Sequence, residues 1–197
     1  PVSITTELHR RLVHLRDSGL LSACLYEEYE QSLVFSCPGV AHPRTLIVVA
    51  TPSPAVKVRF HLEDGPLEAV IPPTYVHRAD QERCLQILRS VVAPAGGAVA
   101  LAHGPVKLLA THSGLAQYGR NNLAYVKGFG SYVRLDMYCT DVDLGAVRDE
   151  FKGSLRMSCC PPCRNCHHVC PTGCIPHDGT VIEAERCLTY LNEHEGE

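Results

Sequence analysis

The placement of cysteine is the feature that most constrains this chain. Seven of its 11 cysteines lie between Cys159 and Cys187, and the other four lie at or before Cys139. A small secreted protein would spread its cysteines to staple a core, whereas 197 residues with 45% hydrophobic content can bury a core without staples. An odd number of clustered thiols therefore indicates metal or redox chemistry in a reducing compartment. The scattered thiols are expected to be small core residues.

The densest part of the cluster has a specific spacing. Two residues separate Cys160 from Cys163 and Cys163 from Cys166, and three separate Cys166 from Cys170, which stands just before Pro171. Bacterial ferredoxins have this spacing, in which three thiolates hold one [4Fe–4S] cluster and the fourth belongs to another. Zinc is the alternative, because Cys-x-x-Cys pairs also bind zinc, although zinc modules set two such pairs about a dozen or more residues apart.

A count of ligands leaves a deficit. Each cubane takes four cysteines, the motif supplies Cys160, Cys163, Cys166 and Cys170, and Cys187 is a fifth candidate. Cys159 and Cys174 lie off the spacing. The chain is therefore expected to hold slightly more than half of a two-cluster module that continues beyond Glu197. The alternative is a single cluster with Cys187 or Cys170 as its fourth ligand.

Charge and hydropathy exclude several classes of function. With 18 basic and 21 acidic residues the net charge is −3, so no basic field indicates nucleic acid or an anionic membrane as a partner. The longest purely apolar run, 46–50, is far too short to cross a bilayer, and no N-terminal signal is evident. We expect a soluble, cytoplasmic protein.

Periodicity before residue 153 predicts a mixture of helices and strands. Leu8, Leu12 and Leu15 predict a helix over 5–18, capped by Thr5 or Thr6 and ended by Gly19. A second helix is predicted over 79–92, and strands are predicted over 46–50, 56–60, 98–102 and 132–139. The expected class is α+β or α/β, with helices covering a sheet. The change to Cys, Pro and His near residue 153 predicts two domains, 1–152 and 153–197.

A glycine-rich segment, 113–134, precedes the last predicted strand. Its glycines and the pair Asn121-Asn122 imply tight bends and a close approach to the main chain. The spacing is not that of the Gly-x-Gly-x-x-Gly dinucleotide fingerprint. The residue types fit a cofactor or substrate site and a structural loop packed on the cysteine module equally well.

Four parts of the sequence together resemble the epoxyqueuosine reductase family and its four-iron double-cluster-binding relatives. They are the segment 113–134, Thr140-Asp141, the cysteine motif with its Pro-Thr-Gly, and the stretch 185–190. The resemblance implies a nitroreductase-like α/β sandwich domain that binds cobalamin. It also implies a ferredoxin-type module after that domain, with two [4Fe–4S] clusters that relay single electrons to the corrinoid.

The resemblance assigns residues by position. Cys160, Cys163 and Cys166 would bind the first cluster, and Cys170 and Cys187 the second. The residues that match the segment beside the cofactor are Gly114, Gly119, Arg120, Asn121, Gly130 and Ser131.

One departure from the family concerns the proton donor. The family's catalytic Asp falls at Thr74, and a threonine hydroxyl cannot serve as a general acid near neutral pH. His77 and Asp80 are the remaining candidates. Epoxide reduction on transfer RNA is therefore not expected, and the charge balance lacks the basic surface that would hold that RNA.

Three functions stay open from the sequence. The leading one is a reductase whose clusters feed a cofactor or substrate beside the glycine-rich segment, with cobalamin as the cofactor in its corrinoid-dependent form. Its partners would be a ferredoxin- or flavodoxin-type redox protein or a small-molecule substrate. The second is a non-catalytic electron carrier or partner subunit without cobalamin. The third is a structural or sensing module built on a cluster or on zinc.

Overall fold

A three-stranded antiparallel sheet forms the centre of the protein. The computed structural model describes residues 2–71, 79–145, 156–177 and 182–194. In the sheet, β7 (Val133–Thr140) lies between β1 (Thr45–Pro52) and β4 (Val99–Leu101). Thr140 is opposite Thr45 on one side and opposite Val99 on the other. The sheet thus joins strands that lie far apart in the sequence.

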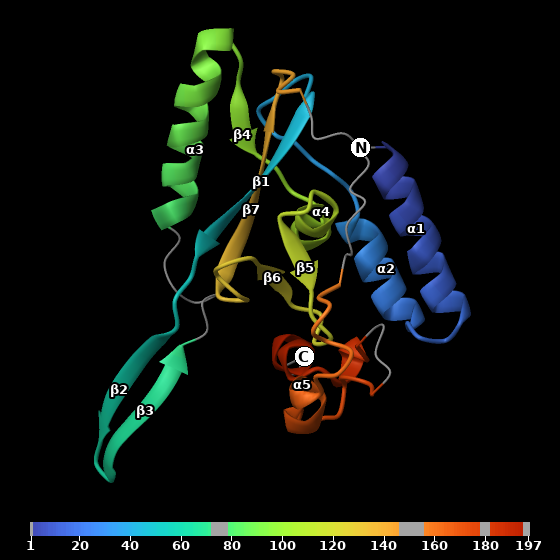
Figure 1. The fold of residues 1–197 in the computed structure, drawn as a ribbon, viewed down its shortest axis with the longest axis vertical. Helices are drawn as coiled ribbons and strands as arrows, with labels where there is room; N and C mark the ends of the chain where they lie inside the picture. The colour runs from blue at the N-terminus through green and yellow to red at the C-terminus, as the bar shows by residue number, and fades with distance from the viewer. Residues whose placement is uncertain (1, 72–78, 146–155, 178–181, 195–197) are drawn as a thin grey trace.

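Helices cover both faces of this sheet (Figure 1). On one face, α3 (Ala79–Val92) packs against Tyr138, and Val92 and Val99 complete that cluster. On the other face, α4 (Val106–His112) packs against Met137 and Cys139. Because successive β-strand side chains alternate between faces, β7 supplies both cores from adjacent residues.

The N-terminal helices form a further layer outside α4. The pair α1 (Val2–Asp17) and α2 (Ala23–Ser32) buries Leu12, Leu21, Leu25 and Tyr26 against one another. Ser22 caps α2 by accepting a hydrogen bond from the Leu25 N–H, which satisfies one of the free donors at its start. Tyr190 of α6 (Leu188–His194) packs on the same cluster, so the N-terminal helices contact the end of the described chain.

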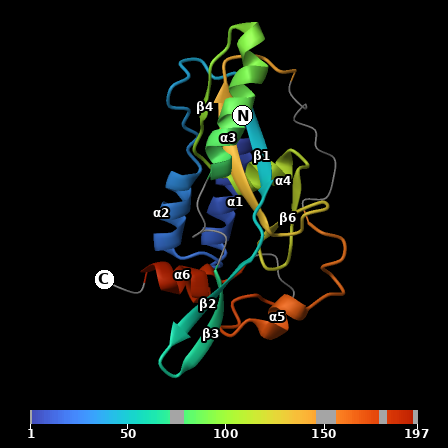
Figure 2. The same ribbon diagram turned by 90° about the vertical axis from the view of Figure 1, so that its left-hand side faces the viewer.

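Two hairpins flank the sheet. The glycine-rich segment forms β5 (Ala116–Tyr118) and β6 (Ala124–Val126). The longer hairpin, β2 (Val56–Leu62) and β3 (Gly65–Ile71), extends away from the body in both views (Figures 1 and 2). One of its faces is apolar, with Phe60 opposite Leu67, and the other is charged, with Arg59 opposite Glu68.

Short helical turns occupy the remaining segments. The 3-10 turn η2 (Ala93–Ala95) follows α3, while α5 (Asn165–Val169) and the 3-10 turn η3 (Ala184–Arg186) belong to residues 156–187, called here the cysteine-rich segment. Within the residues that the structure describes, no helix is both long and apolar enough to span a membrane.

The structure confirms the mixed α+β class and most predicted elements. The helix 79–92 has the predicted bounds, and the strand predicted over 46–50 extends to 45–52. The N-terminal helix begins at Val2, so the prediction that Thr5 or Thr6 caps it is wrong, whereas Gly19 does follow its end with a left-handed φ of +72°. The predicted domain boundary near residue 153 lies outside the described residues.

A buried carboxylate on β7 provides a test of the α3 face. Asp136 is 6% exposed, and its Oδ1 accepts a 2.7 Å hydrogen bond from Gln81 Nε2, while Oδ2 is buried without a partner among the described residues. Gln81→Ala would leave both oxygens unpaired, so we expect the free energy of unfolding to fall by about 1–3 kcal/mol.

Urea denaturation followed by circular dichroism measures this loss. Gln86→Ala is the matched control, because Gln86 lies exposed on the same helix and donates a long, 3.4 Å hydrogen bond to the exposed Glu82. That variant should stay within about 0.5 kcal/mol of the parent protein. Equal stability of both variants would contradict the role assigned to Gln81.

Candidate functional site

The tip of the β5–β6 hairpin is held by its own residues. Gly119 N–H donates to Leu123 O, and Asn121 Oδ1 accepts from Leu123 N–H while its Nδ2 donates to the Tyr125 hydroxyl. A Cβ on Gly119 would lie 2.5 Å from the Tyr125 ring, so only glycine fits there. Asn122 adopts a left-handed φ of +59°. Gly119 and Asn121, predicted beside a cofactor, thus shape the turn itself.

Arg120 points from this turn to the cysteine-rich segment. Its guanidinium donates to the carbonyls of His177 at 2.5 Å, Cys160 at 3.1 Å and Pro161 at 3.4 Å. Its Nε is buried without a partner in the described part of the chain. A residue predicted to contact a cofactor therefore clamps two stretches of the cysteine-rich segment, which no sequence spacing indicated.

A backbone contact also joins the β5–β6 hairpin to the cysteine-rich segment, and we call this contact region the junction. The Met157 N–H donates to Tyr118 O at 3.0 Å, and Tyr118 forms a parallel bridge with Arg156. The glycine-rich segment therefore meets the cysteine-rich segment through main chain as well as through Arg120.

The other predicted glycines lie at turns of the same segment. Gly114 follows α4, where its N–H donates to Thr111 O, and Gly130 exchanges hydrogen bonds with Val126. Ser131 is half-buried beside Gly130. Whether these residues contact a cofactor remains a prediction.

The thiols predicted to bind the first cluster lie on one short stretch that runs through turns into α5. Cys160 and Cys166 are half-buried and Cys163 is exposed, with Cys166 inside α5. All 11 cysteines are free thiols. No three His, Cys, Asp or Glu side chains of the described residues come together in a group that could hold a metal ion. The metal ligands therefore remain predictions from spacing and donor type.

Cys170 and Cys174 form a close thiol pair. Their Sγ atoms are 3.5 Å apart, and Thr172 Oγ1 is 3.6 Å from Cys170 Sγ. The Thr172 hydroxyl lowers the pKa of Cys170 to about 6, with a further contribution from Cys174, whereas burial raises the pKa of Cys174 to about 11. At neutral pH the pair holds one thiolate and one thiol. Spacing placed Cys174 outside the ligand set, and this contact was not foreseen.

The following turn is tied to this pair. Glu183 N–H donates to Cys174 O at 2.8 Å, and Arg186 donates to Thr172 O at 2.6 Å and to Glu183 Oε2 at 2.7 Å. Cys187 comes directly after Arg186, and its electrostatic interaction with Cys174 adds to burial in raising the pKa of Cys174. Cys187 therefore lies near enough to Cys174 to act on it electrostatically, while the direct thiol contact is between Cys170 and Cys174.

The candidates for a proton donor divide between described and undescribed residues. Thr74 and His77 lie outside the described residues. Asp80 is exposed in the first turn of α3, where it lines a small cavity of about 80 Å³ with Thr51 and Arg134. The catalytic role of Asp80 remains a prediction.

The fold and this junction define a class of protein, an α+β protein whose cysteine-rich segment is bound to a glycine-rich hairpin. No family model matches the chain. Parts of it are similar to curated proteins named epoxyqueuosine reductase, which confirms the resemblance seen in the sequence.

The curated relatives match less than half of the chain. The protein of Francisella cf. novicida (strain Fx1) is 30% identical over 83 residues, which are 42% of this chain and 22% of that protein. The protein of Atelocyanobacterium thalassa (isolate ALOHA) is 33% identical over 89 residues, which are 44% of this chain and 27% of that protein. The matches thus cover about a quarter of the relatives' own length.

Solved structures extend the likeness in fold. A crystal structure of selenomethionine-labelled epoxyqueuosine reductase matches with a TM-score of 0.60 and 16% identity over 97% of this chain and 52% of that one. The epoxyqueuosine reductase of Streptococcus thermophilus matches with a TM-score of 0.50 and 20% identity over 77% of this chain and 41% of that one. At these identities the likeness concerns the fold, and the chain spans about half of either structure.

Arg120→Gln tests the junction. We expect the variant to lose the fork of hydrogen bonds to Cys160 and His177, so backbone amides in 157–177 should exchange hydrogen faster by about tenfold or more, while β7 keeps its protection. Hydrogen–deuterium exchange read by mass spectrometry measures both regions. Arg59→Gln on the projecting hairpin is the control, and equal exchange in the two variants would contradict the clamp.

Thr172→Val tests the thiolate at Cys170. In protein freed of metal by a chelator, the rate of alkylation of Cys170 by iodoacetamide should rise with pH around a midpoint near the pKa of about 6. Removing the hydroxyl donor should raise this midpoint, because the thiolate loses its main stabilising hydrogen bond. Peptide mapping by mass spectrometry gives the rate. Thr189→Val, exposed on α6, should leave the midpoint unchanged, and an unmoved midpoint in Thr172→Val would refute the assignment.

Proposed function

We propose that this chain is an iron–sulfur redox protein whose cysteine-rich segment passes single electrons to a cofactor or substrate beside the glycine-rich hairpin. The observation that carries the proposal is the clamp made by Arg120, whose guanidinium bonds the carbonyls of Cys160, Pro161 and His177. This contact fixes the ligand-bearing loop against the hairpin. Electron transfer needs such a short, rigid path, because tunnelling falls steeply with distance.

The donor set fits an iron–sulfur cluster in its chemistry. Cys160, Cys163 and Cys166 would hold one [4Fe–4S] cluster, and Cys170 and Cys187 would contribute to another. None of these thiols is engaged in a disulfide, and each is half-buried or exposed. When bound, such a cluster supplies one-electron transfer. The similarity to epoxyqueuosine reductases supports this assignment.

The chain's own residues would tune the site. The Arg120 charge lies against the loop that carries Cys160, and positive charge near a cluster raises its reduction potential. Thr172 and Cys174 both contact Cys170 Sγ. A hydrogen bond to a ligand sulfur also raises the reduction potential of a cluster. Both effects favour the reduced form.

The finer organisation follows the family resemblance. We assign residues 1–152 to a nitroreductase-like sandwich domain and 153–197 to a ferredoxin-type module, in a cytoplasmic protein. A corrinoid is the proposed cofactor beside Gly114 to Ser131, with a ferredoxin- or flavodoxin-type protein as the electron source. Because Thr74 replaces the family's acid, we propose a reduction other than that of epoxyqueuosine.

A structural zinc site is the second candidate, and one distance favours it. Thiolates bound tetrahedrally to one zinc ion at about 2.3 Å stand about 3.8 Å from one another, whereas thiolates on different irons of a cubane are farther apart. The 3.5 Å between Cys170 and Cys174 Sγ is close to the single-ion value. This distance concerns two thiols only, because the described residues bring no third metal-binding side chain into a group with them.

Anaerobic reconstitution separates the two candidates. With iron and sulfide, we expect absorption near about 400 nm and close to four irons and four sulfides per cluster. Cys163→Ser should lower both, whereas Cys84→Ser, on the sheet-facing side of α3, should not. Zinc retained in place of iron, with no acid-labile sulfide, would overturn the cluster assignment.

Cofactor titration then addresses the reductase. A spectral change on adding base-off cobalamin or flavin to the reconstituted protein is the expected result. If neither cofactor changes its spectrum, the non-catalytic electron carrier without cobalamin replaces the reductase.

A further inference from the structure

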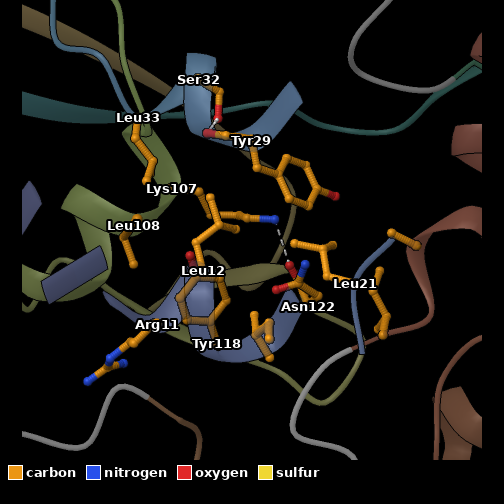
Figure 3. Close-up of a pocket in the computed structure, with 13 residues that line it drawn as sticks. Arg11, Leu12, Leu21, Tyr29, Ser32, Leu33, Lys107, Leu108, Tyr118 and Asn122 are labelled. Atoms are coloured by element: carbon orange, nitrogen blue, oxygen red, sulfur yellow. Dashed lines mark hydrogen bonds between the residues drawn. The ribbon is translucent and has the colours of Figure 1, made fainter. Parts of the chain in front are cut away.

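A cavity of about 360 Å³ lies between the N-terminal helices and the glycine-rich hairpin (Figure 3). Its walls come from α1, α2, α4 and β5, together with Ile182 and Ala184 near the end of the described chain. Five leucines give the cavity an apolar lining, and two tyrosines add aromatic area: Leu12, Leu15, Leu21, Leu33, Leu108, Tyr29 and Tyr118. Volume and lining are those of a site for a small, largely apolar molecule.

Lys107 brings a charge into these apolar walls. Figure 3 shows its side chain reaching toward Asn122, whose carbonyl accepts a 2.9 Å hydrogen bond from Nζ. Asn122 has a left-handed backbone conformation in the β5–β6 turn, and this turn carries the carbonyl that accepts the hydrogen bond. Nζ also lies 5.7 Å from the centre of the Tyr118 ring, and burial lowers the pKa of Lys107.

The hydrogen bonding of this amine is incomplete. A protonated lysine has three donors, and the described structure gives Nζ one acceptor, Asn122 O. A hydrogen-bond donor that is left unpaired in a partly desolvated site costs free energy. Among the residues that the structure describes, no Asp or Glu lines the cavity, and Arg11 contributes to its wall. Within this described lining, Lys107 is therefore a cation without a carboxylate partner.

We propose that this cavity binds a small amphipathic carboxylate, with its anionic oxygens on Lys107 and its apolar or aryl body against the leucines. The volume excludes a whole corrinoid or a nucleic acid. A neutral apolar ligand would leave the other two N–H donors of Lys107 without acceptors. A strongly polar anion would make no apolar contact with the leucines. The inference goes beyond the redox function and does not depend on any cluster, although Tyr118 and Asn122 flank Arg120 on the same hairpin.

Isothermal titration calorimetry with 4-phenylbutyrate as the probe tests the proposal on the full chain. The carboxylate should bind, and its neutral counterpart 4-phenylbutyramide should bind at least about tenfold more weakly, because the amide lacks the charge that pairs with Lys107. Lys107→Met should weaken carboxylate binding at least about tenfold and leave amide binding nearly unchanged. Lys57→Met, an exposed lysine of the projecting hairpin, should bind as the parent does.

A second variant keeps the test decisive if Lys107→Met folds poorly. Leu108→Phe should fill part of the cavity and weaken both probes with Lys107 intact. Thermal unfolding monitors the fold of each variant. The proposal is overturned if 4-phenylbutyrate gives no saturable heat, if the amide binds as tightly as the acid, or if neither variant changes the affinity.

Discussion

The structure depends on the burial of one strand between two others. Residues 136–140 of β7 are all buried, and both edges of the strand pair antiparallel, with β1 and β4. Since alternate side chains enter opposite cores, shifting β7 by one residue would exchange the packing partners of α3 and α4. The register of this strand therefore fixes where α4 lies, and through α4 it fixes the hairpin that carries Arg120.

The two sites proposed above meet on that hairpin without using the same side chains. Arg120 reaches the cysteine-rich segment, while Tyr118 and Asn122 border the cavity that Lys107 enters. The glycine and the asparagine of the turn serve its geometry, because Gly119 admits the Tyr125 ring and Asn121 bonds the turn's own groups. A rigid turn of this kind holds the cysteine-rich segment and the cavity in a constant relation to each other.

Sequence predicted the elements whose patterns are local and strong. The helix 79–92 and the strand β7 have clear apolar periodicity. In contrast, α4 has only seven residues and α2 is mostly polar, so the hydrophobic pattern predicted neither helix. Long-range contacts were not predictable, since nothing near Arg120 in sequence names Cys160 or His177 as partners. The closeness of Cys174 to Cys170 likewise arises from the folded turn rather than from ligand spacing.

The projecting β2–β3 hairpin has a consequence for the behaviour of the protein in concentrated solution. A two-stranded ribbon leaves both outer edges with unpaired backbone groups, which are templates for strand addition between copies. Its apolar face, with Phe60 43% and Leu67 53% exposed, would favour such addition. Lys57 and the Arg59–Glu68 ion pair place charge on the opposite face. These charges oppose edge-to-edge stacking and so act as the hairpin's protection against aggregation.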